Sequence, residues 1–392
     1  MYKFLFSDGE DVCLYEDGKI VKRHSKFIEN YKNACASVER ARTWKQSGEG
    51  AKFCGDVRYE AEGESAMCTI NGVWFTSKDN EIVYSFTVDQ SSGVYKIDLS
   101  DEKAPEIHVV NSVDYRFSGG CCDAVTDILV TEISRNYCNS DIAVLDLKSG
   151  DYKTVTDGDT MDGDPFISPD DADAVYFSSR GVGRTLNGDF AGFSPASVCK
   201  LNISALEVEE ILSSDKYNYF KPIVSGGKLY VLRTPSKDKK PNPLLEIILI
   251  PFRIIQALVN FINVFVTAFT GKSLASGGSN PAKGRKYDSR EQFVKGNLIN
   301  VDKQLKTNAR KDKDGYGFIP LSWQIIEAES GKVIKSGIAD YDITDDGTVI
   351  ATNGKRIFAV KDGKSVKLCD TERCLTVSCR HGSGKSSDLF VI

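Results

Sequence analysis

The fold is decided by residues 162–180, which read DGDPFISPDDADAVYFSSR. An apolar pair, Phe166 and Ile167, leads into a Ser-Pro-Asp-Asp turn, and residues 174–177 then alternate as a strand does. Pro169 presets φ for a turn, and the two aspartates after it can hydrogen-bond back to the turn backbone. The stretch therefore predicts two antiparallel strands joined by a tight turn.

This pattern resembles the repeat of TolB-like and WD-repeat-like β-propellers. That repeat runs Asp-x-x-Pro-x-aromatic-Ser-Pro-Asp-Gly, followed by an apolar strand that ends near Ser-x-Arg. Here Ile167 takes the place of the usual aromatic residue, and Asp171 takes the place of the usual glycine. The resemblance implies a ring of four-stranded blades, and it implies no particular activity.

Related strands recur along the chain. Residues 94–99, 142–147 and 198–203 occupy equivalent places at intervals of about 50 residues, which is typical of propeller blades. Residues 343–369 contain a degenerate copy of the turn and three further strands. We expect an all-β propeller of six or seven blades, and the number depends on whether residues 27–69 form a blade or a short helix.

Both ends of the chain carry strand patterns that are too short for a blade. Residues 2–6, 11–15 and 19–24 read as strands separated by Asp-Gly turns, and residues 375–379 and 388–392 read as strands at the other end. We expect the N- and C-terminal strands to share one sheet and close the ring, because closure removes unpaired strand edges.

Composition excludes some classes of function. The net charge of −5 argues against general nucleic-acid binding. The 11 cysteines include no Cys-x-x-Cys pair, and the N-terminal residues lack the pattern of a signal peptide, so we expect reduced thiols and a cytoplasmic protein. Cys369, Cys374 and Cys379 recur near His381, but half-buried strand thiols explain them better than a metal site. No cofactor or metal is expected.

One long insertion interrupts the strand pattern. We expect residues 1–235 and 321–392 to form the propeller and residues 236–320 to form the insertion, with an apolar helix at 244–270 and a basic linker after it. Of the 26 residues 244–269, 19 are apolar. Polar residues recur every three or four positions from Arg253 to Thr270, so they occupy a stripe of about 100° on a helix.

A helix with so wide an apolar face needs cover. Leaving half of these side chains in water costs on the order of 15–25 kcal/mol, which exceeds the stability of a typical domain. Packing on the propeller itself is one alternative. A single membrane crossing is excluded if the propeller closes, because both ends of the insertion then lie on the same side. There remain a helix in the membrane interface, a hairpin bent at Pro251, and a helix covered by a protein partner.

We expect this helix and its basic flanks to bind an anionic lipid surface or an unidentified protein, with the protein peripheral at the membrane. The apolar residues expected to make the contact are Leu244, Ile248, Phe252, Ile255, Leu258, Phe261, Ile262, Phe265 and Phe269, and the basic residues are Lys239, Lys240, Arg285 and Lys286. The function predicted from the sequence is a non-enzymatic interaction platform. The alternative is a propeller enzyme with an active site at the mouth of the central channel.

Two further motifs resemble ligand sites. Residues 380–387, RHGSGKSS, resemble a phosphate-binding loop, but Cys379 stands where the first glycine belongs, and no helix pattern follows. Asp157, Asp159, Asp162 and Asp164 form an acidic run, yet they lack the glycine and glutamate of a helix-flanked calcium loop. We therefore expect neither nucleotide binding nor a calcium loop of that type.

Overall fold

The computed structural model describes residues 2–42, 68–88, 91–101, 103–136, 138–171, 173–236, 291–311 and 317–382. The chain divides into two compact units. The first comprises Met1–Pro235 and Asp302–Ile392, and the second comprises Ser236–Val301.

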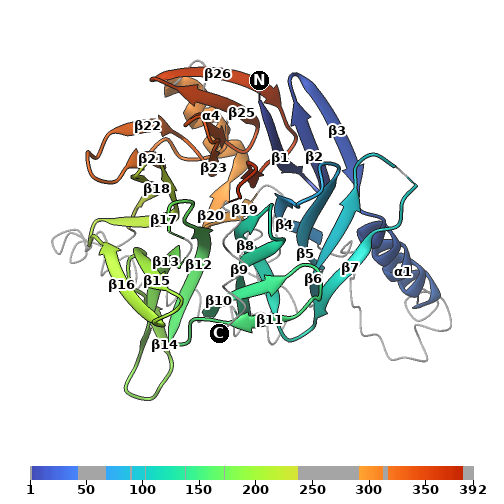
Figure 1. Ribbon diagram of the computed structural model, residues 1–392, viewed down its shortest axis with the longest axis horizontal. Helices are drawn as coiled ribbons and strands as arrows, with labels where there is room; N and C mark the ends of the chain where they lie inside the picture. Colours follow the sequence, from blue (N-terminus) through green and yellow to red (C-terminus); the bar gives the residue numbers. More distant parts are fainter. Residues whose placement is uncertain are drawn as a thin grey trace, which may run out of the picture. The chain divides into compact units, whose positions relative to one another are not determined.

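In its described residues the first unit contains four separate four-stranded antiparallel sheets (Figure 1). In sheet order they are β27 (Val377–Ser378), β1 (Lys3–Asp8), β2 (Asp11–Glu16) and β3 (Lys19–His24); β4 (Cys68–Phe75), β5 (Glu81–Val88), β6 (Ser91–Asp98) and β7 (Ile107–Ser112); β17 (Tyr217–Ser225), β18 (Lys228–Pro235), β21 (Gln324–Glu327) and β22 (Val333–Ser336); and β23 (Asp340–Ile343), β24 (Val349–Thr352), β25 (Arg356–Lys361) and β26 (Lys364–Asp370).

A nine-stranded sheet completes the strands of this unit. Its members are β8 (Arg116–Asp123), β9 (Ile128–Asn136), β10 (Asn139–Asp146), β11 (Tyr152–Thr154), β12 (Thr160–Ile167), β13 (Ala174–Arg184), β14 (Phe190–Phe193), β15 (Ser197–Asn202) and β16 (Glu207–Leu212). All pairings within it are antiparallel except one, the parallel pairing of β10 with β12 at Ser140 and Met161. The sheet therefore consists of two antiparallel runs joined at a single point.

Six strands of the first unit contact one another in a closed cycle. The order is β4, β8, β12, β17, β23 and β27, and β27 contacts β4 again (Figure 1). Each of these strands begins or ends its antiparallel run, so the sheets follow one another around a common centre. This arrangement confirms the prediction of an all-β, propeller-like fold.

Residues 162–180 fold as their pattern predicts. The end of β12 pairs with the start of β13 through Phe166 with Tyr176 and Ile167 with Val175. The Ser168 hydroxyl oxygen, rather than an aspartate side chain, accepts the Asp171 N–H at 3.2 Å and closes the turn.

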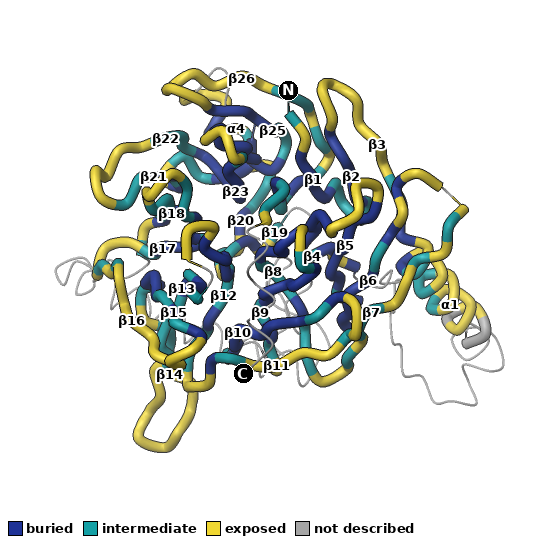
Figure 2. Tube along the Cα trace, viewed as in Figure 1, coloured by how far each residue is buried: buried dark blue, intermediate teal, exposed yellow. Residues whose placement is uncertain are grey.

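The core lies between neighbouring sheets (Figure 2). The largest buried cluster joins Phe177 of β13 with Phe220 of β17, Ile325 of β21 and Tyr341 of β23. Because each strand buries alternate side chains against the next sheet, stability depends on the complete ring rather than on any single sheet.

The two ends of the chain meet in one sheet, as predicted. In the antiparallel pairing of β1 with β27, Leu5 lies opposite Ser378 and Phe6 lies opposite Val377. The predicted closing strand at 388–392 lies outside the described residues, and the closing pairs come from β27 instead.

Helix α1 (Lys26–Arg42) occupies the first part of the segment that the sequence left open. Ser25 caps it by accepting the Ile28 N–H at 3.2 Å, and the Glu106 carboxylate accepts the N–H groups of Lys26 and Phe27 at 2.9 and 3.0 Å. A carboxylate at a helix N-terminus satisfies donors that have no partner within the helix. The helical alternative is therefore correct for this part, and residues 43–67 lie outside the described residues.

The insertion leaves a sheet that is complete without it. β18 and β21 are hydrogen-bonded antiparallel neighbours, with Arg233 opposite Gln324. Helix α4 (Val301–Lys311) ends this stretch, and the Asn308 side chain donates to the carbonyls of Gly317 and Ile319 at 2.6 and 2.8 Å. In the second unit, β19 (Glu291–Val294) and β20 (Asn297–Asn300) form a hairpin.

Candidate functional site

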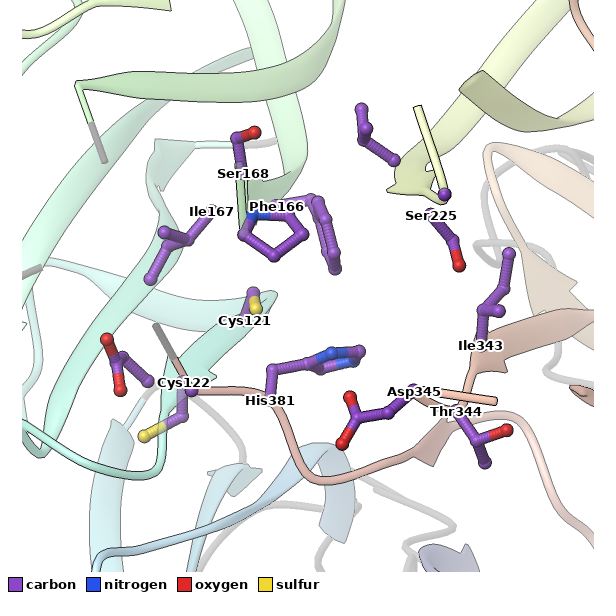
Figure 3. A pocket seen from close by; sticks show the side chains of 15 residues that line it. Cys121, Cys122, Phe166, Ile167, Ser168, Ser225, Ile343, Thr344, Asp345 and His381 are labelled. Atoms are coloured by element: carbon purple, nitrogen blue, oxygen red, sulfur yellow. The ribbon is translucent and has the colours of Figure 1, made fainter. Parts of the chain in front are cut away.

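A cavity of about 180 Å³ lies where the central strands of the first unit end (Figure 3). β8, β12, β17 and β23 each contribute their last residues or the loop that follows, and the segment after β27 contributes His381 and Gly382. Phe166, Ile167, Pro169, Val224 and Ile343 form its apolar walls, and Ser168, Ser225, Thr344, Asp123, Asp345 and His381 supply polar groups. Apolar walls with a few polar groups are typical of small-molecule sites.

His381 forms one wall of this cavity and is held in place from behind. Its Nε2 lies 2.8 and 2.9 Å from the two carboxylate oxygens of Asp342, and its ring meets the ring of Phe166 edge-on at 5.2 Å. Figure 3 shows the imidazole extending among the cavity-lining side chains. The Asp342 carboxylate thereby orients the ring and leaves Nδ1 as its second polar atom.

The Asp342–His381 pair is electrostatically stabilised. Burial by itself lowers the pKa of His381, but the neighbouring Asp342 carboxylate outweighs it, so the pKa lies above its ordinary value of 6.5. Burial by itself raises the pKa of Asp342, but His381, Lys221 and the Cys379 N–H together hold the pKa below its ordinary value of 3.8. The charged forms of both side chains are therefore favoured.

A second buried ion pair lies on the same face of β23, two residues away. The Lys221 ammonium of β17 lies 2.7 Å from Asp340 Oδ2. Burial alone lowers the pKa of Lys221, but Asp340 and then Asp342 raise it above its ordinary value. Lys221 has a φ of 46° beside a bulge in β17, and its carbonyl accepts the Tyr341 hydroxyl at 2.8 Å.

Both aspartates also hold the C-terminal segment. Asp340 Oδ2 accepts the Val377 N–H at 2.9 Å, and Asp342 Oδ2 accepts the Cys379 N–H at 2.8 Å. Alternate carboxylates of β23 thus receive alternate N–H groups of the segment that contains β27. We call Asp340, Asp342, Lys221 and His381 the seam cluster, because these four side chains hold the strand that closes the ring.

The cysteines in the cavity wall are not activated nucleophiles. Burial raises the pKa of Cys121 to about 12, and burial also raises the pKa of Cys122 well above its ordinary value. Both thiols stay protonated at neutral pH, and the thiolate is the reactive form. Within the described ranges, no group of three or more His, Cys, Asp or Glu side chains could hold a metal ion.

The site residues predicted from the sequence lie elsewhere. Lys239, Lys240, Arg285, Lys286 and all nine apolar residues of the expected helix lie outside the described residues, so the structure neither brings them together nor separates them. None of the helices in the described part of the chain is long and apolar enough to cross a membrane.

The two motifs that resembled ligand sites have structural partners where they are described. Arg380, in the loop that resembled a phosphate site, lies 5.2 Å from the Phe75 ring centroid and 3.5 Å from Asp79. In the acidic run, Asp159 pairs with Arg184, and Asp162 Oδ1 accepts the Ser179 hydroxyl at 2.6 Å.

Sequence reasoning missed the seam cluster. The alternation of Asp340 and Asp342 in a strand otherwise rich in apolar residues was the available signal, because carboxylates on one face of a buried strand require partners. Their partners Lys221 and His381 are 119 and 39 residues away in sequence, so no local pattern could identify them.

No family model matches the chain, and no curated protein matches it. Among solved structures, TolB from Acinetobacter baumannii is similar with a TM-score of 0.47 and 10% identity over 96% of this chain and 65% of that chain. A putative TolB from Agrobacterium tumefaciens has a TM-score of 0.35 and 14% identity over 61% of this chain and 73% of that one. An oligogalacturonate lyase from Vibrio parahaemolyticus has a TM-score of 0.37 and 10% identity over 77% and 66%.

The chain thus spans less than two thirds of the length of the Acinetobacter TolB chain. At these TM-scores the likeness carries no argument about activity, and the cycle of central strands and the antiparallel sheets carry the fold assignment. At the level of the fold, the chain resembles the TolB-like β-propellers.

Proposed function

We propose that this protein is a non-enzymatic propeller platform, tethered to an anionic membrane surface or to a protein partner through residues 244–270. One observation carries the proposal. β18 and β21 pair directly, so the chain between them leaves and re-enters the first unit at one edge of a complete sheet. The insertion is not needed to form that sheet, and its apolar residues are available for another role.

The composition of the insertion supports a tether. Residues 244–269 contain 19 apolar side chains, and Lys239, Lys240, Arg285 and Lys286 lie on either side of the apolar stretch. An amphipathic segment with basic flanks binds anionic lipid through apolar burial and through charge attraction. Because both ends of the insertion start from one sheet edge, the segment lies in the interface or forms a hairpin rather than crossing once.

The first unit suits a rigid platform. The buried charges of the seam cluster hold the closing strand, and the central strands contact one another in a closed cycle. We count the two antiparallel runs of the nine-stranded sheet as two blades, which with the four separate sheets makes a propeller of six blades. A closed ring presents a fixed surface to a partner and leaves no free inner edge.

Vesicle flotation tests the tether. The wild-type protein should float with vesicles that contain phosphatidylserine, and part of the binding should be lost as salt rises. The double variant Phe261→Asp/Phe265→Asp should lose binding while its thermal midpoint stays within about 2 °C of the wild type. The matched control, Asn260→Asp/Asn263→Asp, adds the same two charges to the polar stripe and should retain most of the binding.

Two outcomes contradict the membrane tether. If the phenylalanine variant unfolds, these residues belong to a core. If the wild type is stable and never floats, lipid is not the partner, and the isolated insertion should then be used to capture a protein partner.

The second candidate function is small-molecule binding, with or without catalysis, in the cavity at the ends of the central strands. The observation that favours it is the His381 imidazole, oriented by Asp342 and placed among apolar walls and hydroxyl groups. An imidazole oriented by a carboxylate can donate or accept a proton at its second nitrogen.

A fragment screen by thermal shift tests this candidate. Ligands of the cavity should raise the midpoint of the wild type and leave that of Ser225→Leu unchanged, because the larger side chain fills part of the cavity. If every hit shifts both proteins equally, the cavity is not a binding site.

A further inference from the structure

Asp141, on β10, has a buried carboxylate oxygen that lacks a partner. The residue is only 8% exposed, and among the described residues its Oδ1 has no hydrogen-bond partner. An ionised oxygen removed from water without compensation is costly, so such an atom calls for a proton, a water molecule or a cation.

A second buried carboxylate lies beside it. Asp162, on the neighbouring strand β12, is 5% exposed, and its Oδ1 accepts the Ser179 hydroxyl at 2.6 Å. The two strands meet where Ser140 pairs with Met161, and the Ser140 hydroxyl donates to the Asp162 carbonyl at 2.9 Å. Asp141 and Asp162 are therefore held close together at the point that joins the two runs of the nine-stranded sheet.

Charge accumulates at this point. Burial raises the pKa of Asp141, and the carboxylates of Asp162 and Asp157 raise it further, while Arg135 opposes them. Burial also raises the pKa of Asp162. The two acids therefore lie in a place that disfavours both negative charges unless positive charge is added.

The surrounding atoms are oxygens. The hydroxyls of Thr156 and Thr160 lie within hydrogen-bonding reach of the Asp162 carboxylate. The loop between them carries Asp157 at the surface, which gives ions a route from solvent. Carboxylate, hydroxyl and water oxygens are the ligands that hard divalent cations prefer.

We propose that Asp141 and Asp162 bind a hard divalent cation of the calcium type, with Thr156, Thr160 and water supplying further oxygens. The cation links β10 to β12 where only one backbone pairing joins them. With two carboxylates rather than three or more, the expected dissociation constant is on the order of 10⁻⁴ to 10⁻³ M.

Calcium titration of the full chain tests this site. In 10 mM CaCl₂ the thermal midpoint of the wild type should rise by about 2 °C relative to NaCl of equal ionic strength. Isothermal titration with calcium should give one site in the stated range. Asp141→Asn should weaken binding at least tenfold and should lose the calcium-dependent shift.

Asp159→Asn is the matched control, because Asp159 belongs to the same acidic run but pairs with Arg184 at the surface. This variant should keep the calcium response. The proposal is overturned if calcium has no effect on the wild type, since a proton or a water molecule then satisfies Asp141. It is also overturned if Asp141→Asn responds to calcium as the wild type does. Should Asp141→Asn not fold, Asp162→Asn serves as the second variant, with the same loss expected.

Discussion

His381 and Asp342 form a two-point contact in which Nε2 of the imidazole lies 2.8 and 2.9 Å from the two carboxylate oxygens. The aspartate belongs to the central strand β23, and the histidine belongs to the segment that follows the closing strand β27. This contact connects the last complete sheet of the ring to the strand that pairs with the N-terminus. Four predictions concern the seam and the insertion.

The substitution Asp342→Asn should destabilise the protein by about 3 kcal/mol, because it leaves the buried His381 cation without its counter-charge. Urea unfolding monitored by fluorescence measures the change. Asp345→Asn alters a neighbouring exposed carboxylate and should cost less than about 0.5 kcal/mol. Equal costs for the two variants would mean that the buried pair does not hold the seam.

The contribution of His381 to stability should depend on pH. Its pKa in the folded protein lies above the ordinary 6.5, so its contribution is full below pH 6.5 and is lost as pH rises through the folded-state pKa. The pKa of Asp342 lies below 3.8, so its contribution is present above pH 3.8 and is lost as pH falls through its folded-state value.

The pair should therefore stabilise the fold most between about pH 4 and pH 6.5. The measurement is the difference in unfolding free energy between the wild type and His381→Gln from pH 5 to pH 9. This difference should shrink as pH rises above 6.5, and a difference that stays constant over the range would contradict the argument.

Replacing Lys221 by Met should cost about 3 kcal/mol, since the Asp340 carboxylate then remains buried without its cation. Lys200→Met is the comparison, because Lys200 forms a half-exposed pair with Asp171 at 3.3 Å. Such surface pairs contribute about 0–1 kcal/mol. Chemical denaturation of both variants distinguishes the two roles, and similar losses would assign Lys221 to the surface class.

Removing residues 243–270 should leave the propeller folded, because β18 and β21 pair independently of the intervening chain. The shortened protein should also be more soluble, since its apolar side chains no longer require cover. Circular dichroism and thermal unfolding measure the outcome.

Deletion of Val301–Lys311 is the control, because that helix contributes the buried Asn308, which donates to the Gly317 and Ile319 carbonyls. This second deletion should lower the thermal midpoint strongly. A shortened protein without residues 243–270 that fails to fold would show that the insertion is part of the core.

The sequence alone determined the local units of this protein. The alternation and Ser-Pro turn of residues 162–180 predicted the pairing of β12 with β13, and the Asp-Gly turns near the N-terminus predicted β1, β2 and β3. Gly9 and Gly18 adopt φ values of 68° and 88°, which explains why these turns are readable from composition. Such units depend on residues only a few positions apart, so their pattern survives in the linear chain.

Only the tertiary structure decided how the ring closes and what lines its centre. The pairing of β1 with β27, rather than with residues 388–392, depends on where the whole ring brings the C-terminal segment. The seam cluster likewise joins Lys221 to Asp340 across 119 residues and His381 to Asp342 across 39. A buried charge requires a partner, but the sequence does not specify which partner, because proximity inside a closed ring is a property of the complete fold.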